Sequence, residues 1–288
     1  MIQPLLSYVT SNCVELTTKT LSAVLKTVDD FEMHIIDNNS SDNTWEYIQS
    51  LNDDRIKSKT RFDVNYGKIF ATNLNLTKRR PEQSFITIDK TVSVVTKDFI
   101  TRFMKVFEAF PEVGLLGVRE WHLFPKQMPQ VASKTKDRIS YLELKNSNQS
   151  VLENYIPSHC MCLRPELIKE IGYLCEENCY GDIELSYRVN NYTSFKAGFT
   201  KDITIKMPQS SECKSYQYTY DEFKKKFKWK FDETLKDMKS GARPVYCASC
   251  FDSDSTSNHI YNKEWSMENL TFFIDNPNYL DINKILLP

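Results

Sequence analysis

The sequence predicts an α/β protein with a mostly parallel sheet and helices on both faces of that sheet. The first observation is that short apolar segments alternate with amphipathic segments over residues 5–118, as they do in repeated β-α-β units. The second is that three apolar segments end in polar residues, at Thr10 and Ser11, at Asp37 and at Asp89. Because ligands of such sheets bind at the carboxyl ends of the strands, these residues predict a ligand site.

Strands are predicted at residues 5–9, 32–36, 84–88 and 113–118, since each is a short run rich in apolar side chains, and a further strand is predicted at residues 55–59. Helices are predicted between them, at residues 14–25, 45–51, 68–76 and 99–110, where apolar residues recur three or four positions apart. The segment 38–44 is rich in Asn, Ser and Asp, which is typical of a turn that leads into a helix N-cap.

The pattern weakens after residue 118, and we expect residues 119–150 to form a polar connection. Order returns with a strand at 161–163, a helix at 165–171 and a further helix that begins at Asp182. Apolar residues then recur at helical spacing from Tyr220 to Met238. We therefore predict a body of residues 1–210 and a C-terminal helical appendage, residues 211–288, packed on it.

Composition excludes several classes of protein. The 288 residues are 41% hydrophobic and 26% charged, which is typical of a foldable globular chain and not of a disordered one. The 37 basic and 38 acidic residues nearly cancel, so the overall charge does not predict binding to nucleic acid. No apolar run is long enough to span a membrane, and no signal-peptide pattern opens the chain. We expect a soluble, cytoplasmic protein, in the host cytoplasm if it is viral.

The eight cysteines are spread thinly, and buried free thiols are the simplest interpretation in a reducing compartment. Zinc is the alternative, with Cys175 and Cys179 joining Cys247 and Cys250, or with the last two joining His259. Disulfides are the least favoured.

Six segments resemble, in order, the motifs of family 2 glycosyltransferases with the GT-A fold. They are residues 9–12 (VTSN), 36–44 (IDNNSSDNT), 65–73 (NYGKIFATN), 85–89 (FITID), 160–164 (CMCLR) and 181–188 (GDIELSYR). The resemblance covers roughly residues 4–205. It implies the GT-A sheet of nucleotide-diphospho-sugar transferases.

The resemblance also implies a donor site formed by Thr10, Ser11, Asp37, Lys68 and Asp89. A carboxylate at a strand end can accept the N3–H of uracil, and the resemblance gives this role to Asp37, which makes the donor a UDP-sugar. Lys68, at the start of a helix, can contact the ribose or a phosphate together with the amides of that helix end, or it can be an ordinary solvated lysine.

Asp89 occupies the first position of the family's DxD motif, where a carboxylate holds the ribose or a divalent ion that bridges the phosphates. The sequence departs from the motif, because Lys90 and Thr91 follow and the second carboxylate is missing. The histidine that family members often carry later is also absent from its usual place. Either Mn²⁺ or Mg²⁺ is held by Asp89 and His259, or the diphosphate is neutralised by Lys90 or Lys206.

Asp182 matches the carboxylate that acts as general base in inverting members of the family. Such a base lies close to the acceptor hydroxyl and removes its proton during attack. A helix N-cap is the alternative role for this residue. Glu184 and Arg188 lie four positions apart, a spacing that fits an exposed ion pair on one helix.

The acceptor side is predicted at Trp121 and His122, because they follow the strand that lines the acceptor cleft in this fold. Trp121 can stack on a sugar or a base, or simply cover the core. A cluster of lysines in the appendage fits either contact with a phosphate backbone or a solvated helix face. Its members are Lys224, Lys225, Lys226, Lys228 and Lys230.

The sequence therefore predicts an enzyme that transfers a hexose from a UDP-sugar to a hydroxyl acceptor such as a glycan. An alternative follows from the Lys-, Asn- and Tyr-rich, Gly-poor composition, which suggests an AT-rich genome like those of T-even-like phages. In that case the acceptor is a hydroxymethylated or already glucosylated base of DNA. A second alternative, prompted by the incomplete DxD motif, is an inactive protein that only binds a sugar nucleotide or a carbohydrate.

Overall fold

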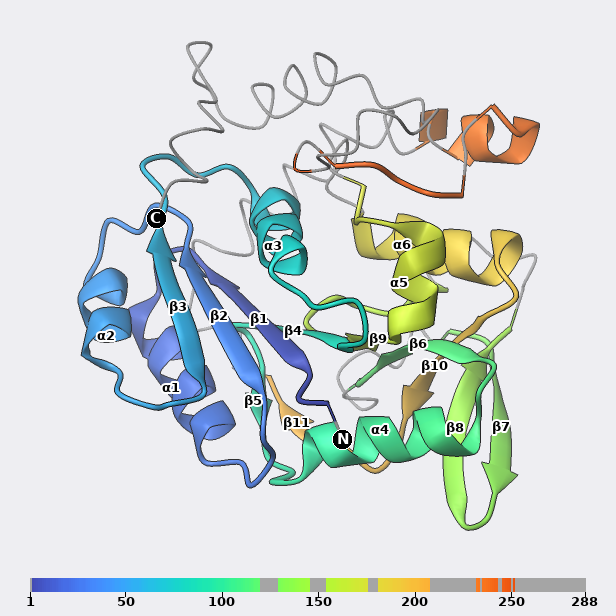
Figure 1. Ribbon diagram of the computed structural model, residues 1–288, viewed down its shortest axis with the longest axis horizontal. Helices are drawn as coiled ribbons and strands as arrows, with labels where there is room; N and C mark the ends of the chain where they lie inside the picture. Colours follow the sequence, from blue (N-terminus) through green and yellow to red (C-terminus); the bar gives the residue numbers. More distant parts are fainter. Residues whose placement is uncertain are drawn as a thin grey trace.

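The computed structural model describes residues 2–119, 129–145, 154–175, 181–207, 232–233, 235–242, 245–249 and 251. Within these residues a nine-stranded mixed sheet carries helices on both faces (Figure 1). The predicted fold class is confirmed. The expected strands and helices of residues 5–118 are all present, with ends that differ by a few residues from the predicted ones.

The large sheet has the strand order β3-β2-β1-β4-β9-β6-β10-β8-β7. Its strands are β1 (Leu5–Thr10), β2 (Glu32–Asp37), β3 (Ile56–Arg61), β4 (Phe85–Asp89), β6 (Val113–Gly117), β7 (Val131–Lys136), β8 (Ile139–Leu144), β9 (Cys160–Leu163) and β10 (Lys196–Thr200). The first four strands pair in parallel, and so do β6 and β10. Strand β9 runs antiparallel between β4 and β6. Two short strands, β5 (Ser93–Val94) and β11 (Ile205–Lys206), form a separate antiparallel pair.

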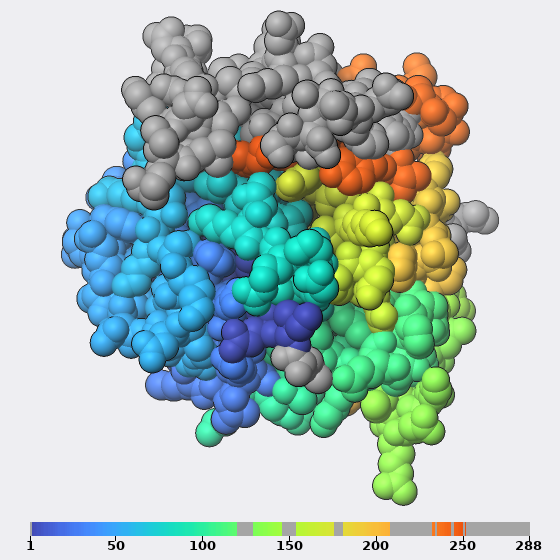
Figure 2. Space-filling model, in the orientation of Figure 1, coloured from blue at the N-terminus to red at the C-terminus, as the bar shows by residue number. Residues whose placement is uncertain are grey.

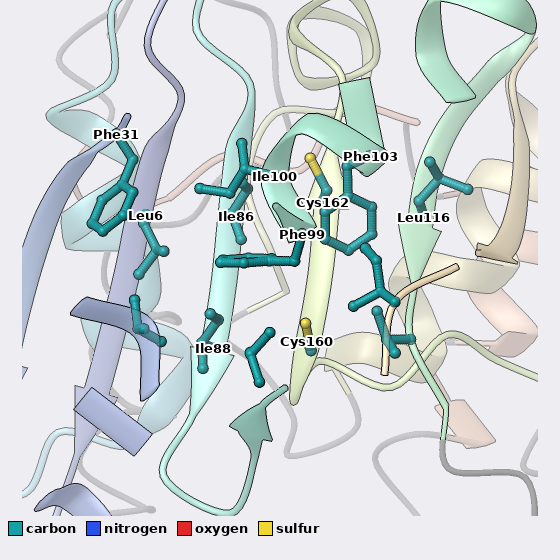
Figure 3. Close-up of a cluster of buried hydrophobic side chains, with 14 of the residues drawn as sticks. Leu6, Phe31, Ile86, Ile88, Phe99, Ile100, Phe103, Leu116, Cys160 and Cys162 are labelled. Atoms are coloured by element: carbon teal, nitrogen blue, oxygen red, sulfur yellow. The ribbon is translucent and has the colours of Figure 1, made fainter. Parts of the chain in front are cut away.

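Alternation along the strands separates two helical layers. The helices are α1 (Val14–Leu25), α2 (Thr44–Ser50), α3 (Lys68–Thr77), α4 (Phe99–Ala109), α5 (Pro165–Ile171) and α6 (Gly181–Tyr192). Leu6, Ile86 and Leu116 point to the face that α1, α2 and α4 cover, and Figure 3 shows these side chains around Phe99 and Phe103 of α4. Their neighbours Leu5, Phe85 and Leu115 point to the other face, against α3, α5 and α6. Because both faces are covered there, the central strands β1, β4, β6 and β9 are buried along their whole length.

The expectation of a polar connection over residues 119–150 is wrong for the part that the structure describes. Strands β7 and β8 form an antiparallel hairpin, and β8 pairs with β10 at the edge of the sheet. Asp137 and Arg138 make the turn with positive φ angles of 50° and 66°, as two-residue hairpin turns require. The hairpin tip projects from the body in Figure 2. Strand β7 has the sequence VASKTK and is exposed over its last four residues, so an edge strand of this kind carries little apolar signal.

The ion pair between Glu184 and Arg188 is buried, which corrects the prediction of an exposed pair. Arg188 Nε lies 2.9 Å from Glu184 Oε1, and the two side chains are only 1% and 2% exposed. The guanidinium also donates to the carbonyl oxygens of Ile171 at 2.5 Å, Tyr173 at 2.9 Å and Val245 at 3.1 Å. Arg188 thus ties α6 to the end of α5 and to residues 245–249 of the predicted appendage.

The described part of the predicted appendage also contacts the body through a bridge between Gly172 and Cys247. Residues 235–240 are helical, and the rest of the predicted amphipathic helix lies almost entirely outside the described residues. The division at residue 210 therefore stays a prediction. No helix within the described ranges has the length and apolar character needed to cross a membrane.

The cysteines fall into two groups in the described part of the chain. Cys160, Cys162, Cys175 and Cys247 are thiols that take part in no disulfide, as predicted. Cys13 takes part in a disulfide, so the expectation of a free thiol is wrong for this residue. Cys179 and Cys250, two of the four cysteines in the zinc alternative, lie outside the described residues.

Candidate active site

The polar residues at the strand ends come together as predicted, because their strands are neighbours and parallel. Thr10 pairs in register with Asp37 of β2, and Val9 pairs with Asp89 of β4. Strand β1 is therefore flanked by two strands that each end in an aspartate. The three turns that follow these strands form the edge of the sheet at which ligands of this architecture bind.

Side-chain hydrogen bonds hold the three turns to one another. Asn12 has a positive φ of 58°, a conformation that asparagine tolerates better than most residues. Its backbone N–H donates to Ser40 Oγ at 2.8 Å, and its side-chain oxygen accepts from the N–H of Ser41 at 2.8 Å. The ammonium of Lys90 donates to the carbonyl oxygens of Ser11 and Asn12, and so joins the turn after β4 to the turn after β1. The edge is a connected unit.

Asp37 is fully buried beneath its own turn, with an exposure of 0%. Its Oδ1 accepts hydrogen bonds from the backbone N–H of Ser40 at 3.3 Å and from the Ser40 hydroxyl, and its Oδ2 lies 3.4 Å from Arg61 Nε. Burial raises the pKa of Asp37, although the hydrogen bonds of Ser40 and the charge of Arg61 oppose the shift. The uracil contact assigned to Asp37 stays a prediction.

Thr10 and Ser11 make hydrogen bonds within the protein at this edge of the sheet. Thr10 is buried, and its hydroxyl is hydrogen-bonded to that of Thr17 at 2.8 Å. The carbonyl of Ser11 accepts from Lys90. Arg61, which pairs in register with Asp37 at the end of β3, keeps 39% of its side-chain surface exposed. It is a cation at this edge that the sequence did not single out.

The loop before α3 is built to present Lys68. Asn38 donates to Asn65 Oδ1 at 2.7 Å and accepts from the backbone N–H of Tyr66 at 2.9 Å, which fixes the loop against the turn after β2. Gly67 has a φ of 84°, in the region that favours glycine, and α3 begins at the next residue. Lys68 therefore starts the helix with its side chain at the strand ends.

Lys68 and Asp89 form a direct ion pair. Lys68 Nζ lies 2.7 Å from Asp89 Oδ2, while Asp89 Oδ1 accepts from the backbone N–H of Thr91 at 2.9 Å and from the Thr91 hydroxyl at 3.0 Å. Burial alone would raise the pKa of Asp89, but the charge and hydrogen bond of Lys68, helped by Thr91 and Lys90, lower it to about 2. The carboxylate is charged at any physiological pH.

Ser158 connects this ion pair to Asp182. Lys68 Nζ donates to Ser158 Oγ at 3.1 Å, and Asp182 Oδ2 accepts from the backbone N–H of Ser158 at 3.1 Å and from its hydroxyl at 3.3 Å. Ser158 lies just before β9, whose antiparallel pairing with β4 brings it beside Asp89. The structure therefore places Asp89, Lys68, Ser158 and Asp182 in one continuous network.

Asp182 stands in the first turn of α6, and the start of this helix packs closely on α3. A Cβ atom added at Gly181 would lie 2.7 Å from the Cδ1 of Ile69, so only glycine allows this approach without movement of Ile69. The Asp182 carboxylate makes its hydrogen bonds to Ser158 and to the next backbone amide, that of Ile183, at 3.0 Å. Burial, followed by the charge of Asp182, raises the pKa of Tyr155.

His159 is a second residue of this region that sequence reasoning missed. Its carbonyl accepts from the backbone N–H of Asp89 at 2.8 Å, and its Nε2 lies 3.0 Å from the carbonyl oxygen of Val118. Burial, strengthened by the charge of Lys68, lowers the pKa of His159 to about 4. Ser158 and His159 directly precede the matched segment 160–164, and that adjacency is the only sequence signal that pointed to them.

Several predicted site residues lie outside the described residues. They are Trp121, His122, His259 and the lysines Lys224, Lys225, Lys226, Lys228 and Lys230. In the part of the chain that is described, no group of three or more His, Cys, Asp and Glu side chains could hold a metal ion. The acceptor and metal assignments stay predictions.

The mixed sheet carries charged side chains at the ends of its parallel strands, and the flanking helices α3 and α6 carry a lysine and a carboxylate in their first turns. The class of protein that this fold defines is the GT-A glycosyltransferase. The chain belongs to the family described as glycosyl transferase family 2, whose model matches residues 9–172. No curated protein sequence matches the chain.

Solved structures of low sequence identity share the fold. S. aureus TarS in complex with UDP-GlcNAc is 15% identical, with a TM-score of 0.52, over 70% of this chain and 56% of that chain. A mannosyltransferase from Pyrobaculum calidifontis in complex with GDP-Man and Mn²⁺ is 14% identical, with a TM-score of 0.52, over the same shares of the two chains. TarS in complex with UDP is 14% identical, with a TM-score of 0.56, over 94% of this chain and 70% of that chain. The chain thus spans little more than half of the first two structures.

Proposed function

We propose that the protein transfers a hexose from a UDP-sugar to a hydroxyl group of an acceptor, with Asp182 as the general base. The observation that carries this proposal is the network in which Ser158 and Lys68 link Asp182 to Asp89 at the strand ends. A donor bound at the strand ends and a base at the start of α6 are thereby held in one frame. The choice of UDP as the nucleotide of the donor is supported by TarS, whose complexes contain UDP-GlcNAc and UDP.

In this mechanism Asp182 takes the proton of the acceptor hydroxyl as its oxygen attacks the anomeric carbon, and the bond from that carbon to the diphosphate breaks. The two hydrogen bonds from Ser158 fix Asp182 Oδ2. Oδ1 accepts from the backbone N–H of Ile183 and keeps a further lone pair for the proton of an acceptor hydroxyl. Lys68 and the backbone amides at the start of α3 attract the negative diphosphate. Holding the donor and the base in fixed positions supplies much of the rate enhancement in such a reaction.

The divalent ion predicted at Asp89 and His259 has a counterpart in the Mn²⁺ of the mannosyltransferase. The described residues do not fit such an ion. A hard cation needs several oxygen ligands, whereas Asp89 is the one DxD carboxylate and has Lys68 on one oxygen and Thr91 on the other. No step of the mechanism is therefore assigned to a metal.

The test is a screen of donors and acceptors with the full chain. We expect release of UDP from one UDP-sugar, accelerated by an acceptor taken from a panel of glycans, polyol phosphates and hydroxymethylated or glucosylated DNA. Acceleration by modified DNA would select the DNA-modifying alternative. Donor binding without turnover of any sugar nucleotide, with or without Mn²⁺, would instead identify the protein as a binder and refute the enzyme proposal.

A further inference from the structure

We propose that Lys68 and Lys90 neutralise the diphosphate of the donor, and that donor binding is independent of a divalent metal ion. The inference rests on the proposed function, since it concerns the same donor site. It starts from the chemistry of the carboxylate that would have to hold a metal, and from the two ammonium groups that the fold places beside that carboxylate.

Both oxygens of the Asp89 carboxylate already accept hydrogen bonds from this chain. Lys68 Nζ lies 2.7 Å from Oδ2, and the N–H and hydroxyl of Thr91 donate to Oδ1 at 2.9 Å and 3.0 Å. A divalent ion on Oδ2 would have to displace the ammonium group, because two cations cannot share that oxygen without strong repulsion. Thr91 stands where the second carboxylate of the motif would be, and its hydroxyl bonds to Asp89. This donor set suits a lysine and not a metal.

Lys68 is placed to bind an anion as well as Asp89. An ammonium group has three N–H donors, and in the described part of the chain two of them reach Asp89 and Ser158. The side chain is 37% exposed, so its head group is accessible to a ligand at the strand ends. It also begins the ten-residue helix α3, whose first backbone amides add to the positive potential there.

Lys90 approaches the same place from the turn after β4. Its ammonium is held by the carbonyl oxygens of Ser11 and Asn12, at the end of β1. Burial lowers the pKa of Lys90, the charges of Asp89, Asp42 and Asp37 oppose this shift, and the positive charge of Lys68 adds to it. Lys68 and Lys90 thus bring two positive charges to the edge at which the diphosphate of the donor would lie.

The experiment measures the affinity of the full chain for UDP and for uridine by calorimetry, in EDTA and again with excess Mn²⁺. We expect the Kd for UDP to agree within about two-fold between the two conditions. Removal of one charged hydrogen bond weakens binding by about ten-fold or more. We therefore expect Lys68→Met and Lys90→Met each to weaken UDP by that factor in EDTA, to leave uridine unchanged, and Lys68→Arg to restore most of the loss.

Lys78→Met is the matched control, because Lys78 follows the other end of α3 and contacts Ser58. We expect it to bind UDP as the parent chain does. A gain in UDP affinity of ten-fold or more with Mn²⁺ in the parent chain would overturn the inference and leave the proposed function intact. Failure to bind any nucleoside diphosphate under either condition would overturn both. If a methionine variant fails to fold, the comparison of EDTA with Mn²⁺ on the parent chain decides alone.

Discussion

Asp182→Asn tests the assignment of the general base most directly. The substitution keeps the size of the side chain and one carbonyl oxygen, and this oxygen can accept the two hydrogen bonds from Ser158 that Asp182 Oδ2 accepts now. It removes the capacity to take a proton and, on the other side of the group, the oxygen that accepts from the backbone N–H of Ile183. General base catalysis typically contributes about 10²–10⁴-fold to a rate. We expect kcat to fall by that factor, which corresponds to about 3–5 kcal/mol of activation free energy, while the Kd for UDP changes less than two-fold.

Glu184→Gln is the matched control, because it removes a carboxylate two residues further along the same helix. We expect Glu184→Gln to lower the free energy of unfolding, because the Arg188 guanidinium stays buried and loses its charged partner. Breaking a buried pair costs about 3–5 kcal/mol, and somewhat less when an amide keeps a hydrogen bond. Unfolding entropies of about 2.1 cal/mol/K per residue give about 0.6 kcal/mol/K for 288 residues. A loss of about 3 kcal/mol should therefore lower the Tm by about 5 °C.

The assay pairs single-turnover kinetics with thermal unfolding for both variants. The reasoning requires Asp182→Asn to lose rate and keep its Tm, and Glu184→Gln to lose Tm and keep most of its rate below the transition. Near-normal turnover of Asp182→Asn would refute the assignment, and the base would have to be sought elsewhere. A large loss of Tm in Asp182→Asn would show that its carboxylate mainly supports the start of α6.

Two further predictions concern stability. Burial holds the pKa of His159 at about 4 in the folded chain, against 6.5 in the unfolded chain. The unfolded chain therefore takes up the proton first as the pH falls. The stability that is present above pH 6.5 is lost as the pH falls towards 4. Because the ring is partly exposed, we expect a loss of about 1–2 kcal/mol by urea denaturation, and a smaller one in His159→Gln. Gly198→Ala should destabilise the chain by about 1–3 kcal/mol, since the new Cβ would lie 2.5 Å from the Leu142 carbonyl oxygen. An unchanged midpoint of urea denaturation in Gly198→Ala would contradict this prediction, and would mean that β8 and β10 can move apart at little cost.

The parts of the fold that could be predicted are those with a local signal. Short apolar runs and helical spacing predict β1 to α4, because strands covered on both faces are apolar throughout and the helices between them are amphipathic. The strand-end residues could be predicted as a group, since parallel strands end at the same edge. The hairpin β7–β8 could not, because its edge strand is polar along most of its length.

Contacts between distant segments were beyond sequence reasoning, and they decide several roles. Glu184 and Arg188 have the spacing of an exposed pair, and only the packing of α6 against α5 and residues 245–249 buries them. Ser158 carries no pattern of its own. Its place follows from the antiparallel pairing of β9 with β4, which no local signal specifies. Asp37 looks like a ligand-binding carboxylate in the sequence, whereas the fold engages it with Ser40 and Arg61.

Lys68 shows what the fold adds to a choice that the sequence leaves even. A lysine at a helix start is as consistent with a solvated side chain as with a ligand contact. The loop fixed by Asn38 directs it to Asp89, and the ion pair at 2.7 Å gives it a defined place. Under our proposal for the donor site, the same contact accounts for the incomplete DxD motif. A second carboxylate beside Asp89 would be needed to hold a metal, but with an ammonium group already there it would reduce the positive charge that we propose attracts the diphosphate. Thr91, which is neutral and satisfied by Asp89, preserves that charge.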